Sequence, residues 1–377
     1  MKTQSKKTAD ECSVLLKNDG NLLPISPEKK IAVIGPFADN PSQMQGSWSM
    51  SSHGKESISI YQGIKEATDK AGGSTTTCTG SWLMCDSTTE SALVNGLFGF
   101  FVKDYTPKPV HSQPLQLMID EAVTQAKTAD VVVACVGESI DMNGEGASRS
   151  DITIPDAQKT LLKALKATGK PIVIILSTGR PLVLTEEDKN FPAILCTWNL
   201  GDQEGYSVAD VLFGKVNPSG HLTMSFPRSV GQLPLYYNHK NTGRPLGDYE
   251  PYRKFTSCYI DVLNSPLYPF GYGMSYTTFK LSSISLSDKN MSIKNGKVIA
   301  SINVTNTGSR EGKETIQLYI HAKESSSTRP VKELRGFKKI DLKAGESKAV
   351  NFTLTPDDLK YYNYDLKYVC EPGCYDI

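Results

Sequence analysis

Long hydrophobic runs are missing from this 377-residue sequence, and so is any marked excess of charge of one sign. No stretch approaches the roughly 18 consecutive apolar residues that predict a membrane-spanning helix. The 41 basic and 40 acidic side chains leave a formal net charge of +1, which gives no electrostatic footprint for nucleic acid or an anionic membrane. Residues 1–11 are polar and lack an apolar segment, so we expect no signal peptide within this chain.

Cysteine and histidine are too sparse and scattered to predict a disulfide framework or a metal centre. Cys135 and Cys196, two of the eight cysteines, lie inside apolar runs, where a free thiol behaves as a small hydrophobe. Two pairs are close enough in sequence to form disulfides, although nothing requires it: Cys78 with Cys85, and Cys370 with Cys374. No cysteine spacing matches a zinc site, and none of the five histidines is a near neighbour. We expect no metal and no cofactor.

The first 214 residues alternate apolar strands with amphipathic helices. We expect strands at 30–35, 75–79, 130–138, 172–176 and 193–197, and helices at 1–20, 59–71, 113–128, 156–168 and 203–214. Strands that are apolar on both faces predict a parallel sheet covered on both sides. The expected fold is therefore a flavodoxin-like, doubly wound α/β sandwich. Residues 80–112 follow no period, and we expect an irregular excursion there.

A phosphate-binding loop is also absent, because no Gly-x-Gly-x-x-Gly follows any expected strand. Residues 215–277 are rich in proline, glycine, tyrosine and asparagine and predict a linker with loops. From about residue 279 the hydrophobic period changes to two, and short alternating segments follow at 298–304, 315–320 and 349–354. This pattern predicts an all-β sandwich of the fibronectin type III-like, immunoglobulin-like kind.

Several segments along the whole chain, in order, resemble glycoside hydrolase family 3, in particular its periplasmic β-glucosidase type. They include Gly179-Arg180-Pro181-Leu182, Asn217-Pro218-Ser219-Gly220, Ser225-Phe226-Pro227-Arg228, Tyr268-Pro269-Phe270-Gly271 and Leu334-Arg335-Gly336-Phe337. The resemblance implies four parts: 1–25, a lead-in helix and interdomain join; 26–230, the family's C-terminal α/β sandwich domain; 231–278, linker and loops; and 279–377, a fibronectin type III-like domain.

The family also has an N-terminal barrel that carries the catalytic nucleophile and most sugar-binding groups, and we find no counterpart of that barrel in this sequence. We therefore expect no nucleophile in this chain. The family's sandwich continues beyond the position that matches Ile377, so we expect the last domain to be cut short. On that expectation, residues after about 360 would exchange fast or be disordered.

Loop 139–154 holds the best candidate for chemistry, because it follows the carboxyl end of the expected strand 130–138, where doubly wound sheets place ligands. Retaining glycosidases use two carboxylates about 5–5.5 Å apart, a nucleophile and an acid/base. Glu145 has glycine on both sides and so can approach a bulky substrate. The residues alone also fit a solvated loop glutamate, but the resemblance implies that Glu145 is the general acid/base.

Four other residues complete the expected site. Glu138 ends the strand and is a rival acid, although we favour a loop anchor that accepts hydrogen bonds. Arg149 and Asp151 suggest an ion pair or a helix cap; we assign Asp151 to loop support and Arg149 to substrate binding, near the charge of Glu145. Trp48 suggests a sugar-stacking platform, with loop packing as the alternative. For Tyr236, Tyr237 and His239 of the linker, packing is the favoured interpretation.

The resemblance implies part of a retaining β-glucosidase that hydrolyses terminal β-D-glucosyl residues, in the periplasm or outside the cell. Its substrate would be a β-glucoside or gluco-oligosaccharide, and the chain alone would be inactive without a barrel in cis or in trans. One alternative is a non-catalytic carbohydrate-binding or scaffold fragment that needs a separately encoded barrel. Another is a flavodoxin-like small-molecule domain, which predicts flavin or nucleotide uptake and is disfavoured by the missing phosphate loop.

Overall fold

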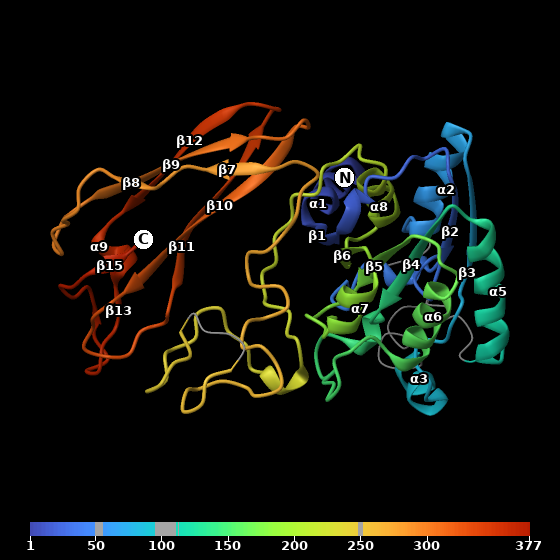
Figure 1. Cartoon of the computed structure of the whole chain (residues 1–377), viewed down its shortest axis with the longest axis horizontal. Helices are drawn as coiled ribbons and strands as arrows, with labels where there is room; N and C mark the ends of the chain where they lie inside the picture. The colour runs from blue at the N-terminus through green and yellow to red at the C-terminus, as the bar shows by residue number, and fades with distance from the viewer. Residues whose placement is uncertain (50–55, 95–110, 112, 248–251) are drawn as a thin grey trace. The chain divides into compact units, whose positions relative to one another are not determined.

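The computed structural model describes residues 1–49, 56–94, 111, 113–247 and 252–377 (Figure 1). These residues divide into two compact units. The first consists of Met1–Leu222 with two short later segments, Phe226–Gly231 and Tyr272–Met274. The second consists of Thr223–Ser225, Gln232–Gly271 and Ser275–Ile377.

A six-stranded sheet in the order β1-β6-β5-β4-β2-β3 forms the centre of the first unit. Its strands are β1 (Val14–Asn18), β2 (Lys30–Ile34), β3 (Ser74–Cys78), β4 (Val131–Gly137), β5 (Ile172–Ser177) and β6 (Ala193–Trp198). All seven positions of β4 and all six of β5 are buried, because helices cover the sheet and a central parallel strand has no solvent-facing side. The α/β sandwich predicted from the sequence is confirmed.

Seven helices accompany this sheet within the described residues of the first unit: α1 (Lys2–Cys12), α2 (Ile60–Ala71), α3 (Ser87–Val94), α5 (Leu115–Thr128), α6 (Asp156–Lys166), α7 (Thr185–Asn190) and α8 (Glu204–Leu212). α8 packs against α1 and α2, while α5 packs against α6. α2 shows how local sequence sets the ends. Ser59 and Gln62 form a reciprocal capping box at its start, and Gly72, with φ +83°, ends it in the left-handed conformation.

The beginning of the chain differs from the expectation. The predicted helix 1–20 ends at Cys12, and the next residues form β1, which runs antiparallel to β6 with Val14 opposite Cys196. The sheet is therefore mixed, with one antiparallel edge strand. The apolar run Val14–Leu16 is 0–1% exposed, so burial against β6 outweighs the continuation of the helix. Helix α3 lies within the segment expected to be irregular, of which 95–110 and 112 fall outside the described residues.

Two small sheets form the sandwich of the second unit, in the orders β11-β10-β15 and β12-β9-β7, with β8 also paired to β9. The strands are β7 (Phe279–Leu281), β8 (Ser285–Leu286), β9 (Val298–Asn306), β10 (Gly312–Ala322), β11 (Glu333–Leu342), β12 (Ser347–Leu354) and β15 (Tyr375–Asp376). Inward-facing residues of both sheets, such as Val304, Leu318 and Phe352, form one core. This arrangement confirms the predicted fibronectin type III-like fold.

The last residues take defined positions in this sandwich, in contrast to the disorder expected after about 360. α9 (Pro356–Leu359) leads into a hairpin of β13 (Tyr361–Tyr362) and β14 (Tyr368–Val369). β15 then pairs with His321 and Ala322 of β10, and Ile377 packs against the core. None of the helices in the described part of the chain has the length and hydrophobicity needed to cross a membrane. Within the same residues, no cluster of His, Cys, Asp or Glu suited to a metal ion is present.

Candidate active site at the carboxyl edge of the sheet

The turn from β4 into the loop requires glycine at position 137. Gly137 has φ +135°, and a Cβ there would lie 1.9 Å from the Ser177 carbonyl oxygen of β5. The side chain of Gln158, from α6, binds this residue twice. Its Oε1 accepts from the Gly137 amide at 2.8 Å, and its Nε2 donates to the Gly137 carbonyl at 3.0 Å. The strand end is thereby fixed, and so is the origin of the loop that follows it.

Glu138 is the buried anchor of the loop. Its side chain is fully buried, and three donors surround the carboxylate. Arg149 Nη1 lies 2.8 Å and Arg180 Nε 3.0 Å from Oε1, and Thr178 Oγ1 donates to Oε2 at 3.0 Å. A buried carboxylate needs such partners to offset its desolvation. Because none of its surface is open to a substrate, the geometry favours the anchoring role over the acid role.

Arg180 fixes the loop through hydrogen bonds to residues on both sides of Glu145. It follows β5, and its Nη2 donates to the carbonyl of Met142 and, at 2.7 Å, to the carbonyl of Ala147. Its Nε binds Glu138, as above. One guanidinium thus holds three points of the loop through charge-assisted hydrogen bonds. Sequence reasoning assigned no role to Arg180. Its position could have indicated this role. Arg180 follows closely after β5, and the carboxyl end of β5 lies at the same edge of the sheet as the loop after β4.

Glu145 is presented to solvent at the tip of this loop. Its side chain is exposed, and it makes no hydrogen bond or ion pair with any residue that the structure describes. Gly144 and Gly146 have φ +93° and +71°, a region that favours glycine. A Cβ on Gly144 would also lie only 2.7 Å from Ser47 Oγ. The two glycines therefore set the backbone path that leaves the carboxylate open.

Trp48 lies beside the same loop. Asn143 is buried and accepts a hydrogen bond from Ser47 Oγ at 3.1 Å while donating to the Ser139 carbonyl at 2.9 Å. The neighbouring indole of Trp48 is 69% exposed, and its Nε1 lies 3.8 Å from where a Cβ on Gly144 would be. The structure thus brings the expected aromatic platform next to the loop of the expected acid. The stacking role of Trp48 stays a prediction.

Arg149 and Asp151 do not form the expected ion pair. Arg149 is paired with Glu138 instead, and its Nη2 donates to the Thr153 carbonyl at 3.0 Å. Asp151 accepts from the Thr153 amide at 2.9 Å, and this hydrogen bond is the main cause that lowers the pKa of its carboxyl. The helix-cap alternative is also wrong, because α6 starts after Pro155 without a side-chain cap. The buried charge of Glu138 attracts the arginine more strongly than an exposed aspartate does.

Two known sequence profiles match the two sandwiches of this chain. The sequence profile of the glycosyl hydrolase family 3 C-terminal domain matches residues 13–276. The profile of the fibronectin type III-like domain matches residues 314–377. The chain belongs to glycosyl hydrolase family 3.

Individual relatives agree with this assignment. The periplasmic beta-glucosidase of Salmonella typhimurium is 46% identical over 99% of this chain and 48% of its own length. A beta-xylosidase of Formosa agariphila is 37% identical over 98% of this chain and 47% of its own length. The crystal structure of a beta-glucosidase from Listeria innocua in complex with isofagomine has a TM-score of 0.86 at 34% identity, covering 99% of this chain and 47% of that one. This chain therefore spans about half the length of the curated relatives it matches.

Proposed function

We propose that this chain is part of a retaining β-glucosidase that hydrolyses terminal β-D-glucosyl residues of β-glucosides or gluco-oligosaccharides. The observation that carries the proposal is the contrast between the two glutamates at this edge of the sheet. Glu138 is buried and fully partnered, whereas Glu145 is exposed and has no partner among the described residues. The beta-glucosidases among the relatives and solved structures support glucose as the sugar.

Glu145 would act first as general acid and then as general base. In the first step it donates a proton to the glycosidic oxygen, so that the aglycone leaves as an alcohol while the nucleophile forms a bond to the anomeric carbon. In the second step its carboxylate takes a proton from the attacking water, and the glycosyl-enzyme bond breaks. Such proton transfer contributes about 10²–10⁴-fold to the rate.

The second carboxylate would come from a barrel domain outside these 377 residues, in cis or in trans. This division is supported by the length of the relatives, since this chain accounts for 48% of the Salmonella enzyme. Trp48 would stack on the sugar with its exposed ring, because an aromatic face suits the apolar C–H surface of a pyranose. Arg180 and Glu138 would hold the loop. The periplasmic relative supports a periplasmic or extracellular location.

Complementation tests this division of labour. We expect the purified chain to show no turnover of 4-nitrophenyl β-D-glucoside, because one carboxylate cannot form the glycosyl-enzyme intermediate. Adding or fusing the N-terminal half of the Salmonella enzyme should give activity, and the Asp151→Asn variant of this chain, altered in the same loop, should retain it. Turnover by the chain alone that is lost in Glu145→Gln would contradict the proposal, because it would place both carboxylates in these residues.

A further inference from the structure

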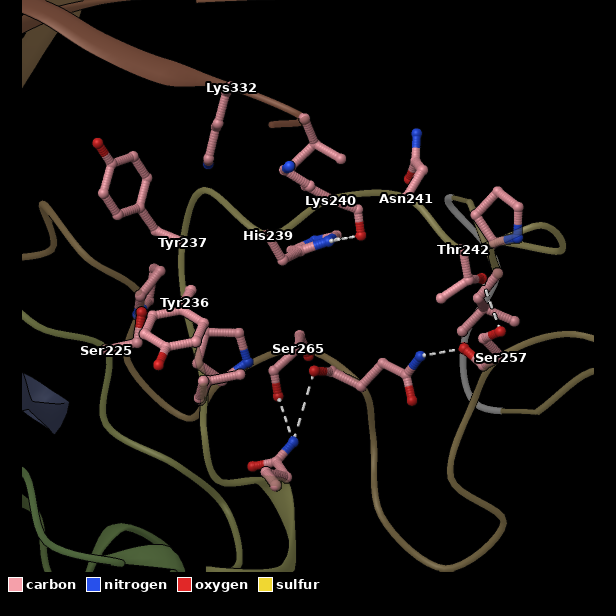
Figure 2. Close-up of a pocket in the computed structure, with 18 of the residues that line it drawn as sticks. Ser225, Tyr236, Tyr237, His239, Lys240, Asn241, Thr242, Ser257, Ser265 and Lys332 are labelled. Carbon is pink, nitrogen blue, oxygen red and sulfur yellow. Dashed lines mark hydrogen bonds between the residues drawn. The ribbon is translucent and has the colours of Figure 1, made fainter. Parts of the chain in front are cut away.

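The second unit contains a pocket of about 920 Å³ (Figure 2). Every residue that lines it belongs to this unit. Most come from the segment Gln232–Phe270, and Val331 and Lys332 close the wall just before β11. The volume lies within the range of about 300–1,000 Å³ that is usual for small-molecule sites.

The lining combines aromatic rings with neutral hydrogen-bonding groups. The aromatic residues are Tyr236, Tyr237, Tyr259 and Phe270, and the amides and hydroxyls are Ser225, Gln232, Asn241, Thr242, Ser257, Asn264 and Ser265. His239 also faces the pocket, and the charged lining residues are Lys240 and Lys332. Among the lining residues that the structure describes, none is an aspartate or a glutamate.

One part of the wall is held rigidly by internal contacts. The Tyr237 ring stacks on Phe270 with 4.1 Å between ring centroids and 14° between planes, and its hydroxyl accepts from the Leu334 amide at 3.3 Å. Gln232 is buried and donates to the Leu263 carbonyl at 2.8 Å. Asn264 donates to the Ser257 carbonyl at 3.1 Å. A preformed wall lowers the entropy cost of binding a ligand.

Other lining groups are left available for a ligand. Tyr236 is 62% exposed, and Asn241 and Lys240 are exposed as well. Their side chains have no partner among the residues that the structure describes. Figure 2 shows Tyr236, His239 and Asn241 along one segment of the wall, with Ser257 and Ser265 contributed by the returning segment. An exposed aromatic ring, an amide and an ammonium group, each without a partner among the described residues, thus lie around one cavity.

We propose that this pocket binds a neutral saccharide unit of an oligosaccharide, with Tyr236 as the stacking ring and Asn241 as a hydrogen-bonding group. A pyranose has an apolar C–H face and a rim of hydroxyls that donate and accept, which is the chemistry that this lining complements. The many amides and hydroxyls disfavour a lipid tail, because burying them without partners is costly. The site does not depend on Glu145 or on a barrel domain, so this proposal goes beyond the proposed function. Either of the two proposals can be wrong while the other is right.

Calorimetric titration of the 377-residue chain with cellotetraose tests this assignment. We expect saturable binding that is weakened roughly 2- to 12-fold by Tyr236→Ala, the range typical of one aromatic contact, and weakened also by Asn241→Ala. Tyr364→Ala is the matched control, because Tyr364 is 89% exposed and does not line the pocket. Far-ultraviolet circular dichroism and the melting temperature of each variant show whether it is folded.

Four outcomes would overturn the proposal. The first is no saturable binding to the wild-type chain. The second is unchanged affinity in both folded pocket variants, or an equal loss in Tyr364→Ala. The third is loss of binding in Trp48→Ala with full binding in Tyr236→Ala, which would move the sugar to the loop of the first unit. The fourth comes from a titration with tetragalacturonate, an anionic oligosaccharide. Tighter binding of that anion than of cellotetraose would contradict a neutral ligand and would indicate that the pocket lysines bind a carboxylate.

Discussion

Glu138 directly precedes the loop that carries Glu145, yet the surroundings of the two residues suit them to different tasks. Two arginines and a threonine donate hydrogen bonds to the carboxylate of Glu138, a residue that is 1% exposed. Glu145 lies between two glycines in the left-handed region and keeps its oxygens open. A general acid needs a carboxyl that can reach the leaving oxygen to within about 2.6–3.2 Å. Of these two carboxyls, Glu145 is the one that a substrate can approach.

The two glycines beside Glu145 make a matched pair of substitutions. In Gly146→Ala the new Cβ meets open space, so the cost is that of the left-handed backbone alone, about 1–2 kcal/mol. In Gly144→Ala the Cβ also lies 2.7 Å from Ser47 Oγ, and the loop or Ser47 must shift. We expect urea unfolding to show a larger loss of stability for Gly144→Ala. Equal losses would mean that the contact with Ser47 does not constrain the loop.

Glu204 provides a pH-dependent term in stability. It is the first residue of α8 and fully buried, and burial raises its pKa from 4.5 to about 8. The folded state therefore holds this proton more tightly than the unfolded state does. Its contribution to the free energy of unfolding is fully present below about pH 4.5 and is lost as pH rises through about 8.

The Glu204→Gln variant isolates this pH-dependent contribution to stability, because glutamine has the same shape as glutamate and does not titrate. Urea unfolding at pH 5, 6.5 and 8 should show the wild type losing stability relative to the variant as pH rises. Other groups titrate equally in both proteins, so only the difference between them is diagnostic. A difference that stays constant across these three pH values would contradict the raised pKa.

At the scale of elements, the loop after β4 is held by residues that follow the neighbouring strand β5. Thr178 and Arg180 come from that neighbouring connection, and Arg180 reaches Met142 and Ala147. This is a consequence of the parallel register, in which Gly137 lies opposite Ser177. Adjacent parallel strands bring their carboxyl-end connections together, so one arginine can brace a loop that begins on another strand.

Arg180→Met tests this brace. We expect a loss of roughly 1–3 kcal/mol in stability, since Glu138 keeps Arg149 and Thr178 as partners while losing one donor. We also expect faster hydrogen exchange of the amides in 139–150, a local effect that general destabilisation does not produce. Arg149→Met serves as the control, because Arg149 binds Glu138 and Thr153 but not Met142 or Ala147. If the hydrogen exchange of the loop amides is unchanged in Arg180→Met, Arg180 does not brace the loop.

The central strands could be predicted from sequence because β4 and β5 are apolar at positions facing both sides. β1 could not, since Leu15 and Leu16 fit a helical pattern as well, and its partner β6 lies about 180 residues later. α7 reads Thr-Glu-Glu-Asp-Lys-Asn and has no apolar period to detect. For the site, glycines around Glu145 marked the loop, but the pairing of Arg149 with Glu138 depends on burial that a local pattern does not reveal.

At the scale of the whole molecule, the chain consists of the family 3 C-terminal domain and a fibronectin type III-like domain, and it spans about half the length of the relatives it matches. Its first unit supplies a positioned acidic loop, and its second supplies a fibronectin type III-like sandwich with a pocket of its own. Retaining hydrolysis needs two carboxylates on opposite sides of the anomeric centre. The proposed function therefore requires Glu145 to be the acid/base that works with a nucleophile from a separate domain.

The most direct test is the leaving-group dependence of Glu145→Ala in the chain joined to the N-terminal half of the Salmonella enzyme. An activated leaving group such as 2,4-dinitrophenolate needs little protonation, whereas the sugar released from cellobiose needs it fully. We predict a loss of about 10²–10⁴-fold in kcat/KM on cellobiose, a much smaller loss on the dinitrophenyl glucoside, and acceleration of glycosyl-enzyme breakdown by azide. Equal losses on both substrates with no effect of azide would contradict the assignment of Glu145.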